Sequence, residues 1–285
     1  MDAWITGIIE PLPLIILFVI IAGALLVLMK GADLLVDQAV SLSVRWGVPK
    51  ILIGATIVSI GTTLPEASVS VLAAVQGVPG LALGNAVGSI IADTGLILGL
   101  AVLIGRVPVN QVIVNRQSWI QVGSAVLLVL VSIPFLTISG MFSEGGRIPQ
   151  VIGFVFLALL VLYIWRSITW SKKAPADAVE DSTVTIESNV KPVIAILELI
   201  LGVTLVILSS KILIPAVEET ALRLNIPDAI IAATLVAFGT SLPELVTAIT
   251  AVRKGHGELA LGNVLGADVL NVLFVTGASA VVTKG

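Results

Sequence analysis

One stretch of 48 residues occurs twice in this chain, and the two copies share short motifs that contain polar residues. Residues 54–101 align with residues 232–279 without a gap, at an offset of 178, and 17 positions are identical. The shared letters include GTxLPE and LALGNxxG. Similarity between apolar segments does not by chance place the same polar motifs at matching positions. The chain therefore consists of two related halves.

The sequence around the two copies is apolar enough to lie in a membrane. Of its 285 residues, 57% are hydrophobic and 12% are charged, and the mean hydropathy is +1.13. Soluble domains carry about 25% charged residues. A run of about 20 apolar residues crosses a bilayer of roughly 30 Å, so we predict an all-α membrane protein with eight spans. The predicted spans are residues 12–40, 48–76, 80–104, 117–137, 149–170, 192–222, 226–252 and 258–282.

The order of the spans predicts how the two copies are oriented. They begin in the second and seventh spans, so five crossings separate them. Since five is odd, the copies face opposite ways across the membrane, as in transporters built from inverted-topology repeats with an ion site between them. We expect an N-terminal half at 1–170, a polar linker at 171–191 and a C-terminal half at 192–285.

The basic residues predict the orientation of the whole chain in a cell membrane. Ten of them lie in segments on one side of the predicted membrane and three on the other. Cytoplasmic loops carry the excess of lysine and arginine. We therefore expect an external N-terminus and a cytoplasmic central linker.

The motif GTxLPE lies in the middle of a span in both copies. Proline removes a backbone donor and frees the carbonyl one turn earlier, so Pro65 frees the carbonyl of Gly61 and Pro243 that of Gly239. Broken helices are tolerated in lipid only where they line a cavity or contact protein. The motifs also bring hydroxyl oxygens, from Thr62, Thr63, Thr240 and Ser241. Ligation by oxygen alone suits Na⁺ and Ca²⁺ and disfavours soft transition metals.

Each copy of this motif ends in a carboxylate, Glu66 or Glu244. A glutamate in a span can also extend to the membrane surface or pair with a lysine. From the middle of a span, however, the side chain is too far from the surface to reach it. Because a central carboxylate costs several kcal/mol on insertion scales, function is the default interpretation. We predict that this pair binds the cation.

The second motif, GNxxG, is followed in each copy by further polar residues. Ser89 and Asp93 are four apart and share a helix face, and Asp93 aligns with Asn271, so one copy has a carboxylate where the other has an amide. We expect Asp93 in or near the ligand shell, the alternative being a polar residue in helix packing. Asp268 aligns with Ile90 and faces either the cavity or an adjacent helix.

Several classes of function find no support in the sequence. The chain has no cysteine, which excludes disulfides and thiolate metal sites. A net charge of −3 gives no indication of nucleic-acid binding. Its one histidine, His256, lies in a short loop, and no spacing typical of an intramembrane protease or other enzyme is present. We expect a non-enzyme without a cofactor, and the sequence carries no signal of oligomeric state.

Two copies of GT[TS]LPE, each followed by GNxxG, resemble the repeats of the calcium/cation antiporter superfamily and in particular its sodium/calcium exchanger branch. The resemblance covers most of the chain. It implies ten helices, of which the second, third, seventh and eighth enclose the ions. It also implies exchange of about three Na⁺ for one Ca²⁺ by alternating access. Na⁺ and Ca²⁺ would be the transported substrates and the lipid bilayer the surroundings.

The resemblance also assigns roles by position. Glu66 and Glu244 match paired Ca²⁺-binding glutamates, and Asp93 and Asn271 match the polar pair at the centre of the site. Ser89 matches a side-chain ligand. Further oxygen donors are implied at Thr62, Thr63, Thr240 and Ser241, with backbone carbonyls for outer Na⁺ sites at Ser59 and Ala237.

This chain departs from the family pattern in several places. Ala267 stands where serine is frequent, which removes a Na⁺ ligand, and Asp268 stands where asparagine is common, which adds a negative charge. The sequence stops after the eighth predicted span, without the family's last two helices.

The choice of counter-ion follows from the second motif. Gly88 and Gly266 replace the acidic residue of the GNxxE pattern that is typical of proton/calcium exchangers, which favours Na⁺ over H⁺. Exchange of Ca²⁺ for H⁺ and passive cation conduction remain the alternatives.

Overall fold

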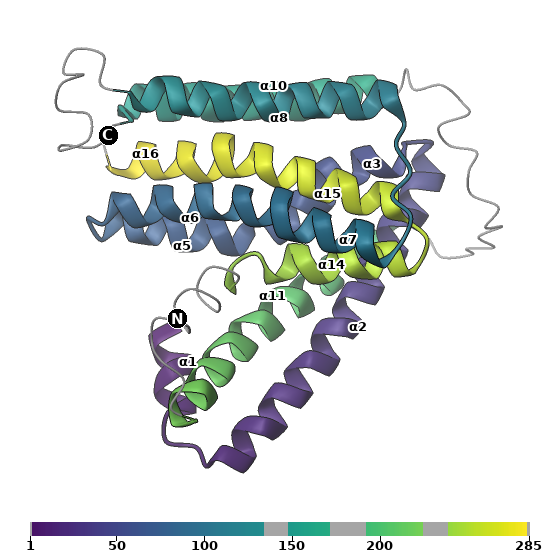
Figure 1. Cartoon of the computed structure of the whole chain (residues 1–285). Coiled ribbons are helices and arrows are strands. Elements are labelled where there is room, and N and C mark those ends of the chain that lie inside the picture. The colour runs from purple at the N-terminus through teal and green to yellow at the C-terminus, as the bar shows by residue number, and fades with distance from the viewer. Residues whose placement is uncertain (1, 134–147, 172–191, 225–238, 284–285) are drawn as a thin grey trace.

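The computed structural model describes residues 2–133, 148–171, 192–224 and 239–283, and its regular elements there are all helical (Figure 1). The first half contains α1 (Asp2–Ile9), α2 (Leu14–Trp46), α3 (Lys50–Ile53), η1 (Gly54–Val58), α4 (Ser59–Thr62), α5 (Leu64–Val75), α6 (Pro79–Ile91), η2 (Ala92–Ile97), α7 (Leu98–Ile104), α8 (Gln111–Ser132) and α10 (Gln150–Ser171). The second half contains α11 (Pro192–Arg223), α14 (Leu242–Arg253), α15 (Gly257–Leu270), η6 (Asn271–Thr276) and α16 (Gly277–Thr283). The elements labelled η are π-helices.

Five helical segments in the described residues are long and apolar enough to cross a membrane. They are Leu14–Trp46, Pro79–Ile104, Gln150–Trp170, Pro192–Arg223 and Gly257–Thr283, and the pair Lys50–Thr62 and Leu64–Val75, bent by 45°, makes a sixth if it is one span. Each of these coincides with a predicted span to within a few residues. The chain is thus a multi-pass membrane protein. Its predicted seventh span begins in residues 226–238, which lie outside the described part of the chain.

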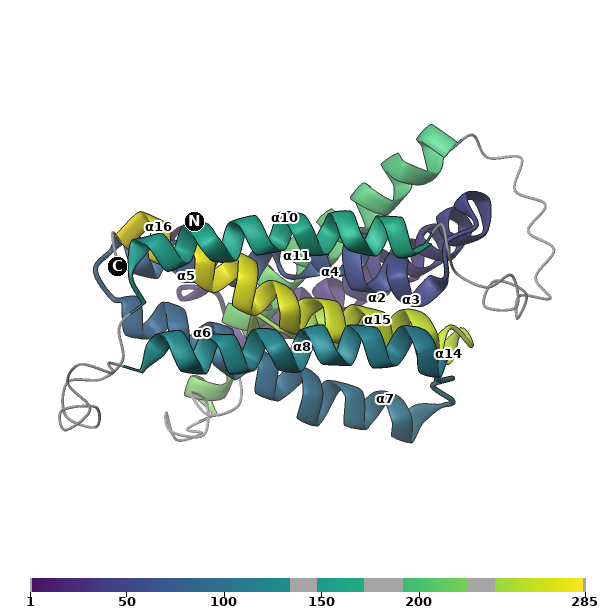
Figure 2. The same cartoon turned by 90° about the horizontal axis from the view of Figure 1, so that it is seen from above.

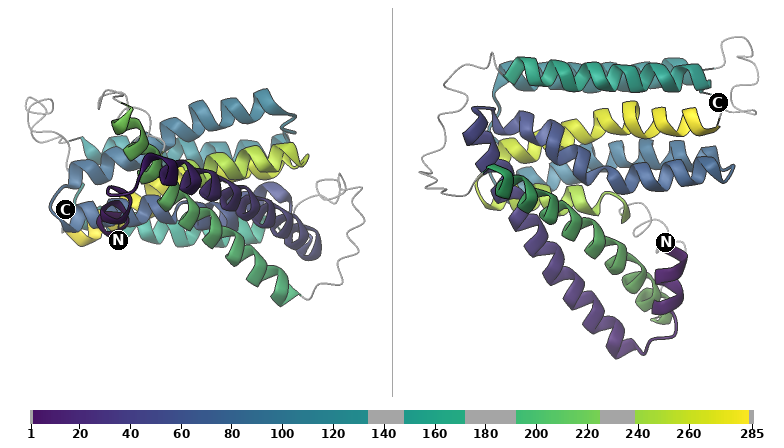
Figure 3. Two further views of the ribbon diagram at one scale, coloured as in Figure 1. Left: turned by 90° about the horizontal axis from the view of Figure 1, so that it is seen from below. Right: turned by 180° about the vertical axis from the view of Figure 1, so that it is seen from behind.

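The helices form a layered bundle with one sloping pair. In Figure 1, α8 and α10 lie along one face, and α15 and α16 lie beneath them, next to α5 and α6. On the opposite face, α2 and α11 run side by side and slope away from the rest, as Figure 3 also shows. From above, α15 and α16 cross obliquely between α8 and α10 (Figure 2). The second helix of the second copy therefore lies at the centre of the bundle.

Small residues let α15 lie in the middle of the bundle. Every residue of this helix except Glu258 is buried. A side chain at Gly262 would collide with the carbonyl of Ile51, and a Cβ at Gly266 would lie 2.5 Å from the Cα of Ala55. Glycine allows such close backbone approach between helices in membranes. This contact fixes α15 against α3, η1 and the beginning of α4.

The two copies of the repeat share an irregular feature near the polar residues of their second helix. The π-helix η2 begins one residue before Asp93, and η6 begins at Asn271, the residue aligned with Asp93. A π-helical turn rotates the following side chains relative to a regular helix and is frequent at functional sites. Sequence periodicity did not predict this feature.

Candidate functional site

The glutamates of the GTxLPE motifs lie where helices begin anew inside the bundle. Helix α4 ends at Thr62 and α5 starts at Leu64, with Pro65 and Glu66 in its first turn. Helix α14 starts at Leu242 and likewise carries Glu244 in its first turn. The free N–H groups of a helix N-terminus carry partial positive charge, which stabilises a carboxylate there. The predicted break at the motif is confirmed for the first copy by the 45° bend between α4 and α5.

The two glutamates are buried and near each other. Each is 1% exposed. Their carboxylates lie close enough to interact electrostatically, and Glu66 interacts in the same way with Asp93. The hydroxyl of Thr63 donates to Oε1 of Glu244 over 3.3 Å, so a residue of the first copy contacts the acid of the second. Neither glutamate reaches the surface of the molecule.

A reciprocal pair of hydrogen bonds joins the first motif of each copy to the second motif of the other. The hydroxyl of Thr62 donates to Oδ1 of Asn263 over 3.3 Å, and that of Thr240 donates to Oδ1 of Asn85 over 3.1 Å. Thr62 aligns with Thr240 and Asn85 with Asn263, at the same offset of 178. The amide of Asn85 also donates to the backbone carbonyl of Glu66 over 3.3 Å. Both asparagines belong to GNxxG, but no sequence pattern indicated a role for their side chains.

Further polar residues predicted for the site are also brought into the interior. Asp93, Asn271 and Asp268 are all buried. Asp93 and Glu244 interact electrostatically, and both also interact with Asp268. The carboxylates thus form one continuous electrostatic group that includes residues from both helices of each copy. Ser59, Ser89, Thr62, Thr63 and Ser241 are buried as well, whereas Thr240 is partly exposed and Ala237 lies outside the described residues.

Several oxygens of this group have hydrogen-bonding capacity left over. Within the described residues, both carboxylate oxygens of Glu66 and of Asp93 accept no hydrogen bond, nor does Oε2 of Glu244. The fully buried polar side chains of the described residues include no lysine or arginine. Buried charges without a partner are costly. An arrangement of anionic and hydroxyl oxygens without a basic partner has the chemistry of a site for hard cations.

The carboxylates do not converge on a single point. No three acidic or histidine side chains of the described residues lie close enough together to hold one metal ion. An ion in this site would therefore take hydroxyl, amide or backbone carbonyl oxygens besides one or two carboxylates. We call the group formed by Glu66, Glu244, Asp93, Asn271 and the neighbouring hydroxyls of Thr62, Thr63 and Ser241 the central site.

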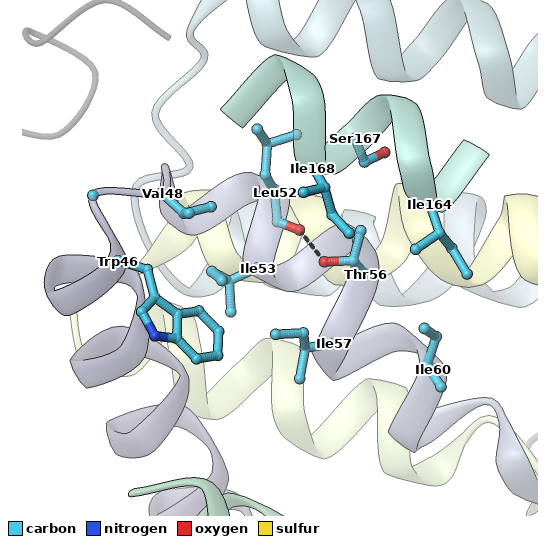
Figure 4. A pocket seen from close by; sticks show the side chains of 11 residues that line it. Trp46, Val48, Leu52, Ile53, Thr56, Ile57, Ile60, Ile164, Ser167 and Ile168 are labelled. Atoms are coloured by element: carbon cyan, nitrogen blue, oxygen red, sulfur yellow. Dashed lines mark hydrogen bonds between the residues drawn. The ribbon is translucent and has the colours of Figure 1, made fainter. Parts of the chain in front are cut away.

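A separate pocket lies on the side of η1 that faces α10. It has a volume of about 400 Å³ and is lined mostly by apolar side chains, among them Trp46, Ile57 and Ile164 (Figure 4). Thr56 is one of its few polar residues, and its hydroxyl donates to the carbonyl of Leu52 in its own helix. None of the buried carboxylates of the described residues lines this pocket.

These features define a class of protein: a multi-pass membrane transporter with a buried oxygen-lined site shared by two related halves. Comparison with known proteins specifies the family. The chain belongs to the sodium/calcium exchanger protein family, whose sequence model matches residues 16–169 and 194–285.

Its relatives include bacterial and archaeal membrane proteins. The inner membrane protein YrbG of Escherichia coli is 34% identical over 93% of this chain and 79% of its own length. The sodium/calcium exchanger MaX1 of Methanosarcina acetivorans is 31% identical over 92% of this chain and 82% of its own. A solved structure of the sodium-calcium exchanger NCX_Mj, soaked with Na⁺ and Sr²⁺, superposes with a TM-score of 0.78 at 27% identity, covering 95% of this chain and 83% of that one.

Proposed function

We propose that the protein is a secondary antiporter that exchanges Na⁺ for Ca²⁺ across the cell membrane by alternating access. The observation that carries the proposal is the meeting of Glu66 and Glu244, one from each copy, in the buried interior without a basic partner among the described residues. Membership of the exchanger family supports it, as does the name of the relative MaX1. An enzyme is not part of the proposal, because the matching family model and the relative MaX1 are named for sodium/calcium exchange.

The proposal assigns the ligands of the exchanged ions to the central site. Glu66 and Glu244 would bind Ca²⁺, assisted by hydroxyls, while Asp93 and Asn271 complete the shell from the second helices. The proposed oxygen donors for Na⁺ and Ca²⁺ are Ser59, Thr62, Thr63, Ser89, Thr240, Ser241 and the backbone of Ala237. The break between α4 and α5, and the corresponding break predicted at the second motif, would contribute carbonyl oxygens that a regular helix would keep in hydrogen bonds.

Competition for negative charge would couple the two fluxes. The carboxylates of Glu66 and Glu244 would balance one Ca²⁺ or the Na⁺ ions that replace it, but not both loads together. When the site is empty, unpaired carboxylates remain in a region of low dielectric constant, which is unfavourable by several kcal/mol. That penalty disfavours crossing with an empty site. A passive channel has no such coupling.

The α2–α11 pair is the element that we propose to move. These two helices slope away from the remaining bundle (Figure 3) and pack tightly on each other, since a Cβ at Gly202 would lie 2.7 Å from the amide nitrogen of Leu35. Sliding of this pair against the other helices would open the central site to one side of the membrane and then to the other.

The proposed topology has eight spans in two inverted halves, 1–170 and 192–285, with the N-terminus outside and the linker 171–191 in the cytoplasm. Since the chain has no cysteine, a thiol reagent labels only a cysteine that is introduced by mutation, and its labelling shows on which side of the membrane it lies. Glu10→Cys should react with an impermeant maleimide added outside intact cells, and Ser171→Cys only after the membrane is opened. The reverse pattern would overturn the orientation.

Transport itself is tested in proteoliposomes with Na⁺, K⁺ and pH gradients imposed in turn. We expect Ca²⁺ uptake that is driven by an outward Na⁺ gradient at fixed pH and that moves net charge. Uptake driven only by a pH gradient would assign H⁺ as the counter-ion. A Ca²⁺ flux whose rate does not depend on any of the imposed gradients would indicate a channel.

A further inference from the structure

Asp268 differs from the other acids of the interior in its contacts and in its position. It lies on α15 and is buried. Its Oδ2 accepts a hydrogen bond from the hydroxyl of Thr94 over 2.7 Å and another from the amide of Gln121. Thr94 belongs to η2 and Gln121 to α8, which lies outside the repeats. We call these three residues the Asp268 cluster.

This cluster lies at the edge of the central site. Thr94 is exposed and Gln121 half-buried, so the polar contacts of Asp268 point toward the outer side of the bundle. The carboxylate still interacts electrostatically with Asp93 and Glu244. Asp268 is therefore near enough to add its charge to the central site, while its own hydrogen-bond partners hold it to one side.

The aligned residue in the first copy is Ile90, so Asp268 has no counterpart there. With Asp268, the number of buried carboxylates in the described interior rises from three to four. One Ca²⁺ compensates two negative charges, so it leaves one of three carboxylates uncompensated, and Asp268 adds a second uncompensated charge. Oδ1 of Asp268 accepts no hydrogen bond from the described residues, and the fully buried side chains among them supply no lysine or arginine.

We propose that Asp268 holds a monovalent metal cation of its own, an alkali ion, which stays bound beside the exchanged load whether that load is Na⁺ or Ca²⁺. The cluster offers Oδ1 of Asp268, the amide oxygen of Gln121 and the hydroxyl oxygen of Thr94, which also accepts a hydrogen bond from the amide of Gln121 over 3.2 Å. What sets this site apart from the proposed Ca²⁺ ligands is that Thr94 and Gln121, by their hydrogen bonds to Oδ2, hold the carboxylate of Asp268 at the edge of the central site. This inference rests on the function proposed above and adds an ion to it.

The test is Ca²⁺ self-exchange, which needs no Na⁺ gradient. Proteoliposomes filled with unlabelled Ca²⁺ receive labelled Ca²⁺ outside, with the same salt on both sides, either potassium or lithium chloride, which avoids competition by Na⁺, or N-methyl-D-glucamine chloride. We expect the original protein to exchange at least about tenfold faster in the alkali salt, because without the alkali ion a buried charge stays uncompensated. Equal rates in the two salts would overturn the inference while leaving the proposed function intact.

Two variants locate the effect. Asp268→Asn removes the charge but keeps an oxygen that accepts the hydrogen bond of Thr94. We expect this variant to exchange Ca²⁺ at the same rate in both salts. Thr94→Val keeps the charge, and we expect it to retain the dependence with a higher half-saturating alkali concentration. If Asp268→Asn is inactive in both salts, Thr94→Val becomes the deciding test. A half-saturating alkali concentration equal to that of the original protein would then contradict an alkali ion bound at the Asp268 cluster. Glu10→Gln, which removes an exposed carboxylate, should behave like the original protein.

Two further outcomes separate the inference from its alternatives. Exchange in N-methyl-D-glucamine that accelerates as the pH is lowered would mean that a proton neutralises Asp268, and would overturn the alkali ion. Absence of labelled Ca²⁺ exchange in every salt, by protein that remains folded, would instead refute the proposed exchange function and with it this inference.

Discussion

The hydroxyl of Thr63 lies 3.3 Å from Oε1 of Glu244, although 181 residues separate them in the sequence. One residue ends the broken helix of the first copy, and the other begins its counterpart in the second. This contact places the acid of one half in the ligand environment of the other. It explains why the two halves must be considered together: neither alone contains the complete central site.

Loss of either glutamate charge should abolish exchange. Glu66→Gln and Glu244→Gln keep the size of the side chain but remove a buried anion that the bound cation needs. Because close charge pairs in a buried site are worth several kcal/mol, we expect Na⁺-dependent Ca²⁺ uptake in vesicles to fall by at least about 100-fold. The exposed Glu10→Gln is the matched control, with normal uptake. Substantial uptake by Glu66→Gln would contradict the central role of the pair.

Thr63→Val should weaken Ca²⁺ binding without preventing transport. Valine has the shape of threonine but cannot donate to Glu244, and one hydrogen bond contributes about 1 kcal/mol. We expect the Ca²⁺ concentration for half-maximal uptake to rise about fivefold, and Thr63→Ser to restore it. Ser68→Ala is a suitable comparison, because the exposed Ser68 hydroxyl donates to the carbonyl of Leu64 in its own helix. A Thr63→Val protein with unchanged half-saturation would show that this hydroxyl is not part of the site.

Gly266→Ala should destabilise the fold. The added methyl group would lie 2.5 Å from the Cα of Ala55 and 2.6 Å from the hydroxyl of Ser59, so α15 and η1 would have to separate. Overpacking of this kind costs about 1–3 kcal/mol, and we expect a lower unfolding temperature in detergent together with reduced transport. Gly123→Ala on α8 is the control, since a Cβ there meets no atom of the described residues within 4 Å. A normal unfolding temperature for Gly266→Ala would refute the tight contact.

His256 should make stability fall in mild acid. Burial and the nearby charges of Lys50 and Lys254 lower the pKa of this imidazole from its ordinary value of 6.5. The folded protein therefore binds the proton less readily than the unfolded chain, and acid favours unfolding. No effect is expected well above pH 6.5, with a loss that grows as the pH falls below that value. His256→Gln should unfold with a smaller dependence on pH in this range, and a dependence equal to that of the original protein would count against the assignment.

The sequence of this protein determined the local features that depend on nearby residues. Apolar runs predicted most membrane helices, and Pro65 predicted the break before Glu66, because proline acts on the backbone of its own turn. Two copies of the same motifs also predicted that acidic and hydroxyl residues far apart in the sequence belong to one site, and their role as ligands stays a prediction. These conclusions needed no knowledge of packing.

Only the tertiary structure decided which side chains meet. The partnership of Thr62 with Asn263 and of Thr240 with Asn85 depends on how two distant segments pack, and no local pattern encodes it. The same is true of Asp268, for which the sequence left the cavity and an adjacent helix equally open: it contacts Thr94 and Gln121 of other helices and still interacts with the central acids. Periodicity fixes the face of a helix to which a residue belongs, but the neighbour of that face is set by the packing of the whole bundle.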